Sequence, residues 1–479
     1  MNPFRLTVIA LALAASFPAQ AQSNAEILKE LQDLKAKVQE LESKLKAQEA
    51  KTQATPGAPG TPGTPQWGMT PEQARELNRV AVKTEALEDA VESQGLKMFK
   101  FSGFMDPTYL WNQRQDRAGF QFLNPVSVDG YNYDNSYFGS VFLDLQKEME
   151  GGTKWRLTLV PKRGTGDVIG EDSIVQEASV SVPLGSLQTR LIAGQVPDWS
   201  GYEYQQATLN KLITHNLLYD FTLPTTYTGV GMEYVRGKWW SRWMLANVNT
   251  SKRNATEKAP AFVYRVDYSR GEFQGFGFAG VHGKAVNYRA FGDDGGPGLN
   301  PVSGEAYDTR DTRINLFEFD AYFIRGDWTV QGQLSWGSQT RAAIAADPET
   351  GKLRDSQWTG FSGLVGWKFI PRWELVGRFD HVRNRKHGGG LLGYTAADDR
   401  NGLGPDATLG CGEAWVEGCD KGANRSALSL GLSYLFNLNT TFKAEARYDR
   451  ANLPVFLDVK TGEYRKSNAV FGTSVVVSF

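Results

Sequence analysis

The chain has 479 residues, and its 52 lysines and arginines nearly balance 53 aspartates and glutamates, which leaves a formal net charge of −1. Balanced charge excludes the strongly basic composition of nucleic-acid-binding proteins. Aromatic residues make up 12% of the chain, beside 51 glycines, and no run of 18 apolar residues occurs. If this protein spans a membrane, it must therefore do so with β-strands.

The first residues, 1–21, have the three parts of a secretory signal peptide. Arg5 supplies the positive charge, Leu6–Ala15 the apolar core, and Ala19–Ala21 a cleavage site of small residues. An apolar stretch of about 12 residues is too short to cross roughly 30 Å of hydrocarbon. We therefore expect residues 1–21 to be removed during export.

Residues 22–54 carry a seven-residue repeat of apolar side chains. Opposite charges occupy the g position of one heptad and the e position of the next, as in Glu30 and Lys35. In a parallel coiled coil these two positions lie on neighbouring helices, so the charges attract. The alternative is a single amphipathic helix that lies on its own domain. We expect a periplasmic coiled coil whose a and d positions join copies of the chain: Ile27, Leu31, Leu34, Val38, Leu41 and Leu45. A Pro/Gly-rich linker at 55–69 and a short helix at 70–95 are predicted to follow.

From residue 96 to residue 479 the apolar period changes to two, which is typical of β-strands. Short turns, several followed at once by an aromatic residue, alternate with longer polar loops. The short turns lie at 151–152, 184–186, 237–238, 271–272, 326–327, 371–372 and 437–439. The long loops lie at 113–135, 162–173, 198–226, 250–260, 284–312, 339–357, 384–425 and 451–467. This segregation predicts an all-β transmembrane barrel of about 16 antiparallel strands.

Alternation along the predicted strands assigns one face to lipid and the other to the lumen. The lumen face is predicted to be charged with both signs. The predicted pore-lining residues are Lys154, Arg156, Arg190, Arg265, Asp267, Glu318, Asp320, Glu374, Arg378, Asp380, Lys443, Glu445 and Arg447.

The carboxyl-terminal part of the chain contributes three further expectations. Phe479 ends the last strand on an aromatic residue, which resembles the signal that outer-membrane proteins present to the barrel assembly machinery. Cys411 and Cys419 lie close together in a glycine-rich stretch of an exported chain, which predicts a disulfide. Arg383 and Arg385 are predicted to meet lipopolysaccharide phosphates, or else simply to be hydrated.

The sequence offers no recognisable catalytic or metal chemistry. The four histidines lack metal-ligand spacing, and no Gly-x-Ser-x-Gly nucleophile motif is present. We expect no enzyme activity, no cofactor and no metal.

The body resembles the sixteen-stranded trimeric porins of Gram-negative bacteria, and the amino-terminal arm resembles that of DcaP-like and phosphate-selective porins. Nearly the whole chain, including Tyr131–Tyr137 and Ile192–Trp199, resembles an uncharacterised exported family known only as a domain of unknown function. The resemblance implies a homotrimeric outer-membrane channel for small polar or charged solutes. The alternative is a structural tether that links the barrel to the cell wall through its arm.

In trimeric porins the third outer loop folds into the channel, and here that loop is 198–226. The resemblance implies that its charged residues face a basic wall that could include Arg156 and Arg190. The constriction candidates are Asp198, Glu203, Lys211, His215 and Asp220. Because the Pro-Glu-Phe-Gly-Gly signature of general porins is absent, an inward and an outward position of the loop both remain open.

Overall fold

The structure is a computed structural model, and it divides the chain into two compact units, residues 1–97 and 98–479. It describes residues 79, 82–83, 98–122, 139–160, 174–251, 260–271, 273–287, 298–300, 302–307, 311–343, 346–386, 403–409 and 416–479. The signal peptide, the coiled coil and the linker predicted from the sequence lie outside these residues. Of the predicted helix at 70–95, the described positions 79, 82 and 83 are helical and exposed. Among the described residues, no helix is long and apolar enough to cross a membrane.

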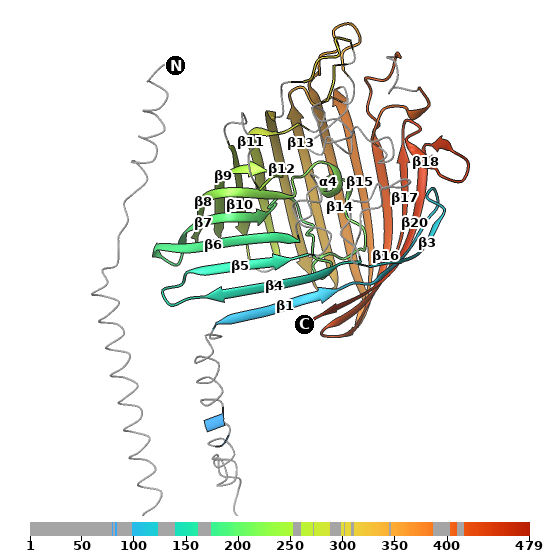
Figure 1. Ribbon diagram of the computed structural model, residues 1–479. Coiled ribbons are helices and arrows are strands. Elements are labelled where there is room, and N and C mark those ends of the chain that lie inside the picture. Colours follow the sequence, from blue (N-terminus) through green and yellow to red (C-terminus); the bar gives the residue numbers. More distant parts are fainter. Residues whose placement is uncertain are drawn as a thin grey trace, which may run out of the picture. The chain divides into compact units, whose positions relative to one another are not determined.

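The second unit is a closed antiparallel barrel (Figure 1). β1 (Phe99–Met105) pairs with β4 (Val141–Glu148), while β2 (Thr108–Asn112) pairs with β3 (Arg117–Gln121). These four elements form two interrupted strands, so the eighteen-stranded sheet amounts to sixteen barrel strands. The barrel closes where β20 (Ser467–Ser478) pairs with β1 and β2. The predicted fold class, about sixteen antiparallel strands in a closed barrel, is confirmed.

The other barrel strands follow one another around the wall in chain order. They are β5 (Lys154–Leu159), β6 (Val175–Ser186), β7 (Thr189–Pro197), β8 (Thr226–Arg236), β9 (Trp239–Val248), β10 (Ala261–Ser269), β11 (Gln274–Val286), β12 (Asp311–Arg325), β13 (Trp328–Gln339), β14 (Ser356–Ile370), β15 (Trp373–Lys386), β16 (Arg425–Asn437) and β17 (Thr440–Ala451). Outside the wall, a 3-10 turn, η4 (Ala407–Leu409), and a hairpin of β18 (Phe456–Asp458) and β19 (Glu463–Arg465) belong to the long loops.

The predicted short turns fall between strands with one exception: residues 184–186 belong to the end of β6, and the chain turns at 187–188. Two-residue turns need left-handed backbone, and Gly237 (φ 59°) and Gly326 (φ 56°) supply it in the turns β8/β9 and β12/β13. Aromatic rings on neighbouring strands pack beside these turns: Trp328 and Trp367 stack at 5.5 Å between ring centres. Turn chemistry and aromatic pairing therefore fix the register at this end of the barrel.

The first long loop, predicted at 113–135, differs from the structure. The chain turns back within four residues of β2 and forms β3, which starts at Arg117. The side chain of Asn112 explains the early turn, because its Oδ1 accepts hydrogen bonds from the backbone N–H groups of Arg114 and Gln115. Five residues of β3 are too few for an alternation to stand out in the sequence.

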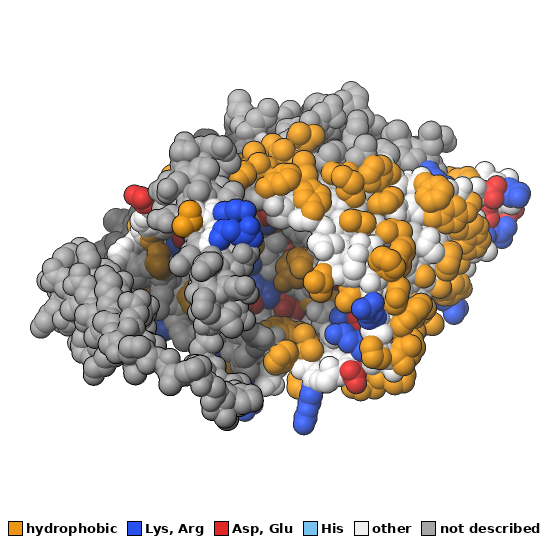
Figure 2. All heavy atoms as spheres, turned by 90° about the horizontal axis from the view of Figure 1, so that it is seen from below, with side chains coloured by type: hydrophobic (Ala, Val, Ile, Leu, Met, Phe, Trp, Pro, Cys, Tyr) orange, Lys and Arg blue, Asp and Glu red, His pale blue; other side chains and the backbone are white. Residues whose placement is uncertain are grey.

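Outward-facing side chains along the wall are apolar, and Figure 2 shows hydrophobic side chains gathered over the outer surface. Along β16, Leu428 and Leu430 are exposed on the outside, while Ser429 and Gly431 are buried toward the lumen. We expect Leu430→Arg to destabilise the folded barrel in lipid by about 2–4 kcal/mol, because a charge in the middle of the membrane is costly. Urea unfolding in lipid vesicles measures this difference. Leu430→Ala is the matched control, and an equal effect of both substitutions would show that this face does not contact lipid.

Candidate functional site

The loop between β7 and β8 lies inside the barrel. Its central turn is the short helix α4 (Leu217–Phe221), which Figure 1 shows within the barrel near β14 and β15. Asn216 caps the helix by accepting a hydrogen bond from the N–H of Tyr219 at 2.8 Å. Leu217 and Leu218 are fully buried. The sequence left open whether the loop 198–226 folds inward or outward, and in the structure it folds inward.

Two arginines of the barrel wall hold the backbone of this loop. Arg378 of β15 donates hydrogen bonds to the carbonyl oxygens of Thr214 (2.7 Å) and His215 (2.9 Å), and to the carboxylate of Glu203 (2.8 Å). Arg447 of β17 donates to the same His215 carbonyl at 2.8 Å. Hydrogen bonds from a charged group are the stronger kind. The loop therefore binds the wall through directed contacts.

Glu445 of β17 also binds the loop, but as an acceptor of hydrogen bonds. Its carboxylate accepts the backbone N–H groups of Ile213 and Thr214, both at 2.8 Å, and the Thr214 hydroxyl at 2.7 Å. Below it, Lys443 donates to the carbonyls of Ala207 (2.7 Å) and Asn210 (2.6 Å). We call Arg378, Lys443, Glu445 and Arg447 the loop clamp.

Apolar contacts fill the spaces beside the clamp. α4 packs into a buried cluster on the lumen face of β15–β17 and β20, which includes Val382, Ala427 and Val470. Gly360 of β14 makes room for the helix, because a Cβ there would lie 2.9 Å from Cγ of Leu218.

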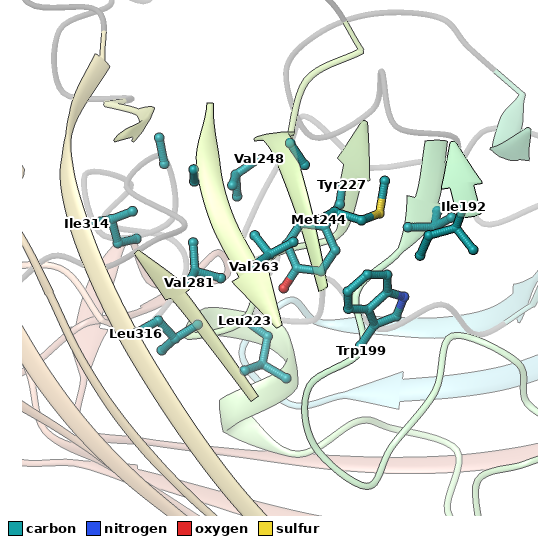
Figure 3. Close-up of a cluster of buried hydrophobic side chains, with 14 of the residues drawn as sticks. Ile192, Trp199, Leu223, Tyr227, Met244, Val248, Val263, Val281, Ile314 and Leu316 are labelled. Atoms are coloured by element: carbon teal, nitrogen blue, oxygen red, sulfur yellow. The ribbon is translucent and has the colours of Figure 1, made fainter. Parts of the chain in front are cut away.

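A second apolar cluster lines the lumen face of β7–β12, where the prediction from the sequence names charges of both signs and no apolar patch. Val263 has the same parity as Arg265, and Leu316 the same parity as Glu318, yet both are fully buried in this cluster (Figure 3). Trp199 and Leu223 of the loop pack against them. Because every second residue of a strand faces inward, extending this alternation over the whole of each strand locates these residues from the sequence.

A cavity of about 860 Å³ lies between the loop and the wall from β4 to β12. Its charged groups pair across the strands. Arg156 contacts Asp144 (2.8 Å) and Glu177 (3.2 Å). Arg265 contacts Asp320 (2.5 Å) and Asp267 (2.7 Å) and donates to the carbonyl of Trp199 at 2.9 Å. Figure 2 shows basic and acidic side chains inside the ring of hydrophobic ones. The cavity is therefore lined by paired charges of both signs.

The predicted pore-lining residues divide into groups. Those lining the cavity are Lys154, Arg156, Arg265, Asp267 and Asp320. Those on the strands behind the loop are Glu374, Arg378, Asp380, Lys443, Glu445 and Arg447. Glu318 is buried and accepts a hydrogen bond from Gln333 at 2.9 Å. Arg190 donates to the carbonyl of Gly152 at 2.6 Å, next to a short turn.

The five constriction candidates have different surroundings in the structure. Glu203 pairs with Arg378, and Lys211 pairs with Glu374 at 2.6 Å. Asp198 accepts the Tyr227 hydroxyl, His215 stacks on Tyr219 at 4.2 Å, and Asp220 is buried in α4. Of the two arginines expected in a basic wall, Arg156 lines the cavity opposite the loop, where Asp144 and Glu177 neutralise it, and Arg190 is buried beside a short turn outside the cavity. Within the described part of the chain, the arginines that donate to the loop backbone are Arg265, Arg378 and Arg447.

The two remaining predicted sites lie at the edges of the described chain. Phe479 forms a backbone pair with Gly103 of β1, with both N···O distances at 3.0 Å, so it lies at the barrel seam. Its role as an assembly signal stays a prediction. Cys419 is buried. Cys411 lies outside the described residues, as does the segment Ile27–Leu45, so the disulfide and the coiled coil also stay predictions.

Glu445→Ala should release the loop from the wall. Removing this acceptor leaves the buried N–H groups of Ile213 and Thr214 unpaired, at a cost of about 3–5 kcal/mol. We expect trypsin to cut the folded variant at Lys211 about tenfold faster than the unsubstituted protein, as measured by mass spectrometry of the fragments. Glu445→Gln keeps one acceptor oxygen and should show a smaller increase. Equal cleavage rates in all three proteins would refute the clamp.

Comparison with solved structures finds barrels of the same kind at low sequence identity. An anion-selective porin from Comamonas acidovorans is 9% identical with a TM-score of 0.50, and the match covers 80% of this chain and 99% of that one. Outer-membrane expressed OmpT of Vibrio cholerae is 12% identical with a TM-score of 0.49 (80% and 97% covered), and OmpF of Salmonella typhi is 10% identical with a TM-score of 0.45 (80% and 97%). Identities this low indicate a shared fold alone.

No curated protein matches the chain. The model of one family matches residues 4–479, so the chain belongs to the family described as a protein of unknown function (DUF3138).

Proposed function

We propose that this protein is an outer-membrane porin, a passive diffusion channel for small polar or charged solutes. The observation that carries the proposal is the cavity of about 860 Å³ between the inward loop and the wall of a closed barrel, which charged residues of both signs line. A water-filled lumen lined by both signs of charge filters solutes by size and charge. The proposal includes no catalytic step, no cofactor and no nucleic-acid partner, and it places the amino-terminal arm in the periplasm.

Because the loop clamp holds the loop against one side of the barrel, the proposed channel runs along the other side. All four clamp residues are used by the loop on the β15–β17 side, so solutes would pass along the β4–β12 side. There Arg156 and Arg265 are each neutralised by two carboxylates, which favours weak rather than strong ion selectivity.

Replacing residues 203–222 by a short Gly/Ser segment should raise the single-channel conductance severalfold, because the loop and α4 occupy the centre of the lumen. Planar-bilayer recordings measure this, and unheated gel electrophoresis confirms that the shortened barrel is folded. An unchanged conductance in a folded variant would contradict the constriction.

We propose further that the channel is a homotrimer whose copies meet over β4–β7. Apart from Trp155 near a short turn, the outer face here is aliphatic, as at Leu157 and Val180, whereas β11 and β12 carry rings such as Phe278 and Phe317. A smooth aliphatic face suits a second copy.

Val180→Arg should separate the copies, because Val180 is 37% exposed at the centre of that face. Unheated gel electrophoresis and native mass spectrometry would report monomers in place of trimers. The test is made in the full chain and in a chain lacking residues 22–54, because the predicted coiled coil could hold copies together by itself. Val365→Arg on β14 is the control and should leave the oligomer intact. Persistent trimers in the Val180 variant of both chains would exclude this interface.

The second candidate is a tether in which the barrel anchors the arm and the arm grips the cell wall. The two apolar clusters that fill the lumen beside the loop favour it, because a filled barrel can anchor without conducting. Deleting residues 22–65 separates the candidates. A porin still conducts after this deletion, while a tether loses its effect on the envelope. In both cases outer-membrane lipids, lipopolysaccharide and the barrel assembly machinery are expected partners.

A further inference from the structure

Arg242 of β9 lies in the cavity between two tryptophan rings. Its guanidinium carbon is 4.7 Å from the ring centre of Trp199 and 4.5 Å from that of Trp240. Trp240 precedes it on the same face of the strand, and Trp199 reaches it from the loop. Tyr227 packs against Trp199 at 5.3 Å in turn and fixes that ring (Figure 3). Two cation–π contacts therefore hold the guanidinium in place.

This arginine differs from its neighbours in having no carboxylate partner. Arg156, Arg265 and Arg378 each pair with at least two carboxylates. Within the described part of the chain, Arg242 makes no ion pair and no hydrogen bond, and its Nε is buried without a partner. Arg242 is half-buried, so its guanidinium is open to the cavity, and a ligand oxygen there can form the ion pair and hydrogen bonds that the described residues do not supply.

The walls around Arg242 are aromatic. Trp199, Tyr202, Tyr204 and Trp240 all line the cavity, and Tyr204 is 52% exposed there. A volume of about 860 Å³ lies within the range of roughly 300–1,000 Å³ that is usual for small-molecule pockets. An apolar, planar group would find flat contact surfaces at this place.

The charges on either side of Arg242 limit how much negative charge the ligand can carry. Glu233 lies directly across the β8/β9 pair from Arg242, and Asp267 is close enough to act on its charge. Arg265, across the β9/β10 pair, is already neutralised by Asp267 and Asp320. Of these two arginines only Arg242 makes no ion pair among the described residues, so it can take one carboxylate of a ligand, whereas a second negative charge on the ligand would meet Glu233 and Asp267.

We infer that the Arg242 cavity is a binding site for aromatic monocarboxylates, with the carboxylate on the guanidinium Nη groups and the ring between the tryptophan and tyrosine side chains. This inference rests on the proposed function, since it names the solute class of the same channel. Binding on the path makes such a solute compete with chloride for passage.

Isothermal titration calorimetry on the purified, folded full-length protein tests the site with benzoate as the probe. We expect saturable binding that Arg242→Gln weakens about tenfold or more, because the charge is lost while the side chain remains long. Arg236→Gln is the matched control, since Arg236 is an exposed arginine at the end of β8 outside the cavity, and it should bind as the unsubstituted protein does. Trp199→Ala should weaken benzoate as well, because it removes one ring of the sandwich.

Three further probes define the ligand class. Cyclohexanecarboxylate should bind several times more weakly than benzoate, and benzylamine and inorganic phosphate should not compete. Equal binding of benzoate by the Arg242→Gln variant and the unsubstituted protein would overturn the site. Phosphate competing as strongly as benzoate would overturn the monocarboxylate assignment.

Single-channel recording of the same samples separates this inference from the proposed function. In a conducting channel, benzoate should reduce the chloride current saturably, and the Arg242→Gln variant should lose this block. A channel that conducts but binds no benzoate refutes the inference and leaves the porin standing. A barrel that binds benzoate but never conducts supports the site and refutes the porin.

Discussion

The clamp between the wall and the inward loop is the interaction on which the rest of the lumen depends. Arg378 and Glu445 are buried, and burying such charges costs several kcal/mol unless they are fully hydrogen-bonded. The loop backbone supplies the partners, with the Thr214 and His215 carbonyls for the arginine and the N–H groups of Ile213 and Thr214 for the carboxylate. The charged side chains of the wall and the backbone groups of the loop satisfy each other's hydrogen bonds, so the loop has one well-defined position. That position leaves the cavity on the opposite side of the barrel.

The two sides of the lumen differ because the barrel strands differ along their inner faces. The inner face of β17 carries charged residues from Lys443 to Asp449, the neighbouring β16 carries small ones such as Ser429 and Gly431, and the long charged side chains reach the loop. On β9–β12 the charged residues, such as Arg265 and Asp320, are followed along the strand by aliphatic ones, such as Val263 and Leu316, that pack under Trp199 and Leu223. The loop thus has a polar attachment on one side and an apolar support on the other. Arg242 lies where the apolar support ends, between the rings of Trp199 and Trp240.

Much of the barrel was predictable because its signals are local. Gly237 and Gly326 mark two-residue turns, aromatic rings flank them, and the alternation around Arg378 and Glu445 gives the inward face directly from parity. The partners of these residues were not predictable. The Ile213 N–H and the carboxylate that accepts it are 232 positions apart in the chain, and no local pattern specifies such a pair. The same limit applies to Arg156, whose carboxylate partners Asp144 and Glu177 on neighbouring strands could not be read from the sequence.

The most direct test of this account compares the accessibility of the two sides of the loop from water. A cysteine is introduced at Ser179, which lines the cavity, or at Ser429, which is fully buried on β16 behind the loop, and a charged thiol reagent is added during a conductance recording. The account predicts that the reagent changes the current of the Ser179→Cys variant at least about tenfold faster than that of Ser429→Cys. The unsubstituted protein, whose two cysteines are predicted to be paired, gives the baseline. Equal rates at the two positions would contradict a loop clamped to the β15–β17 wall.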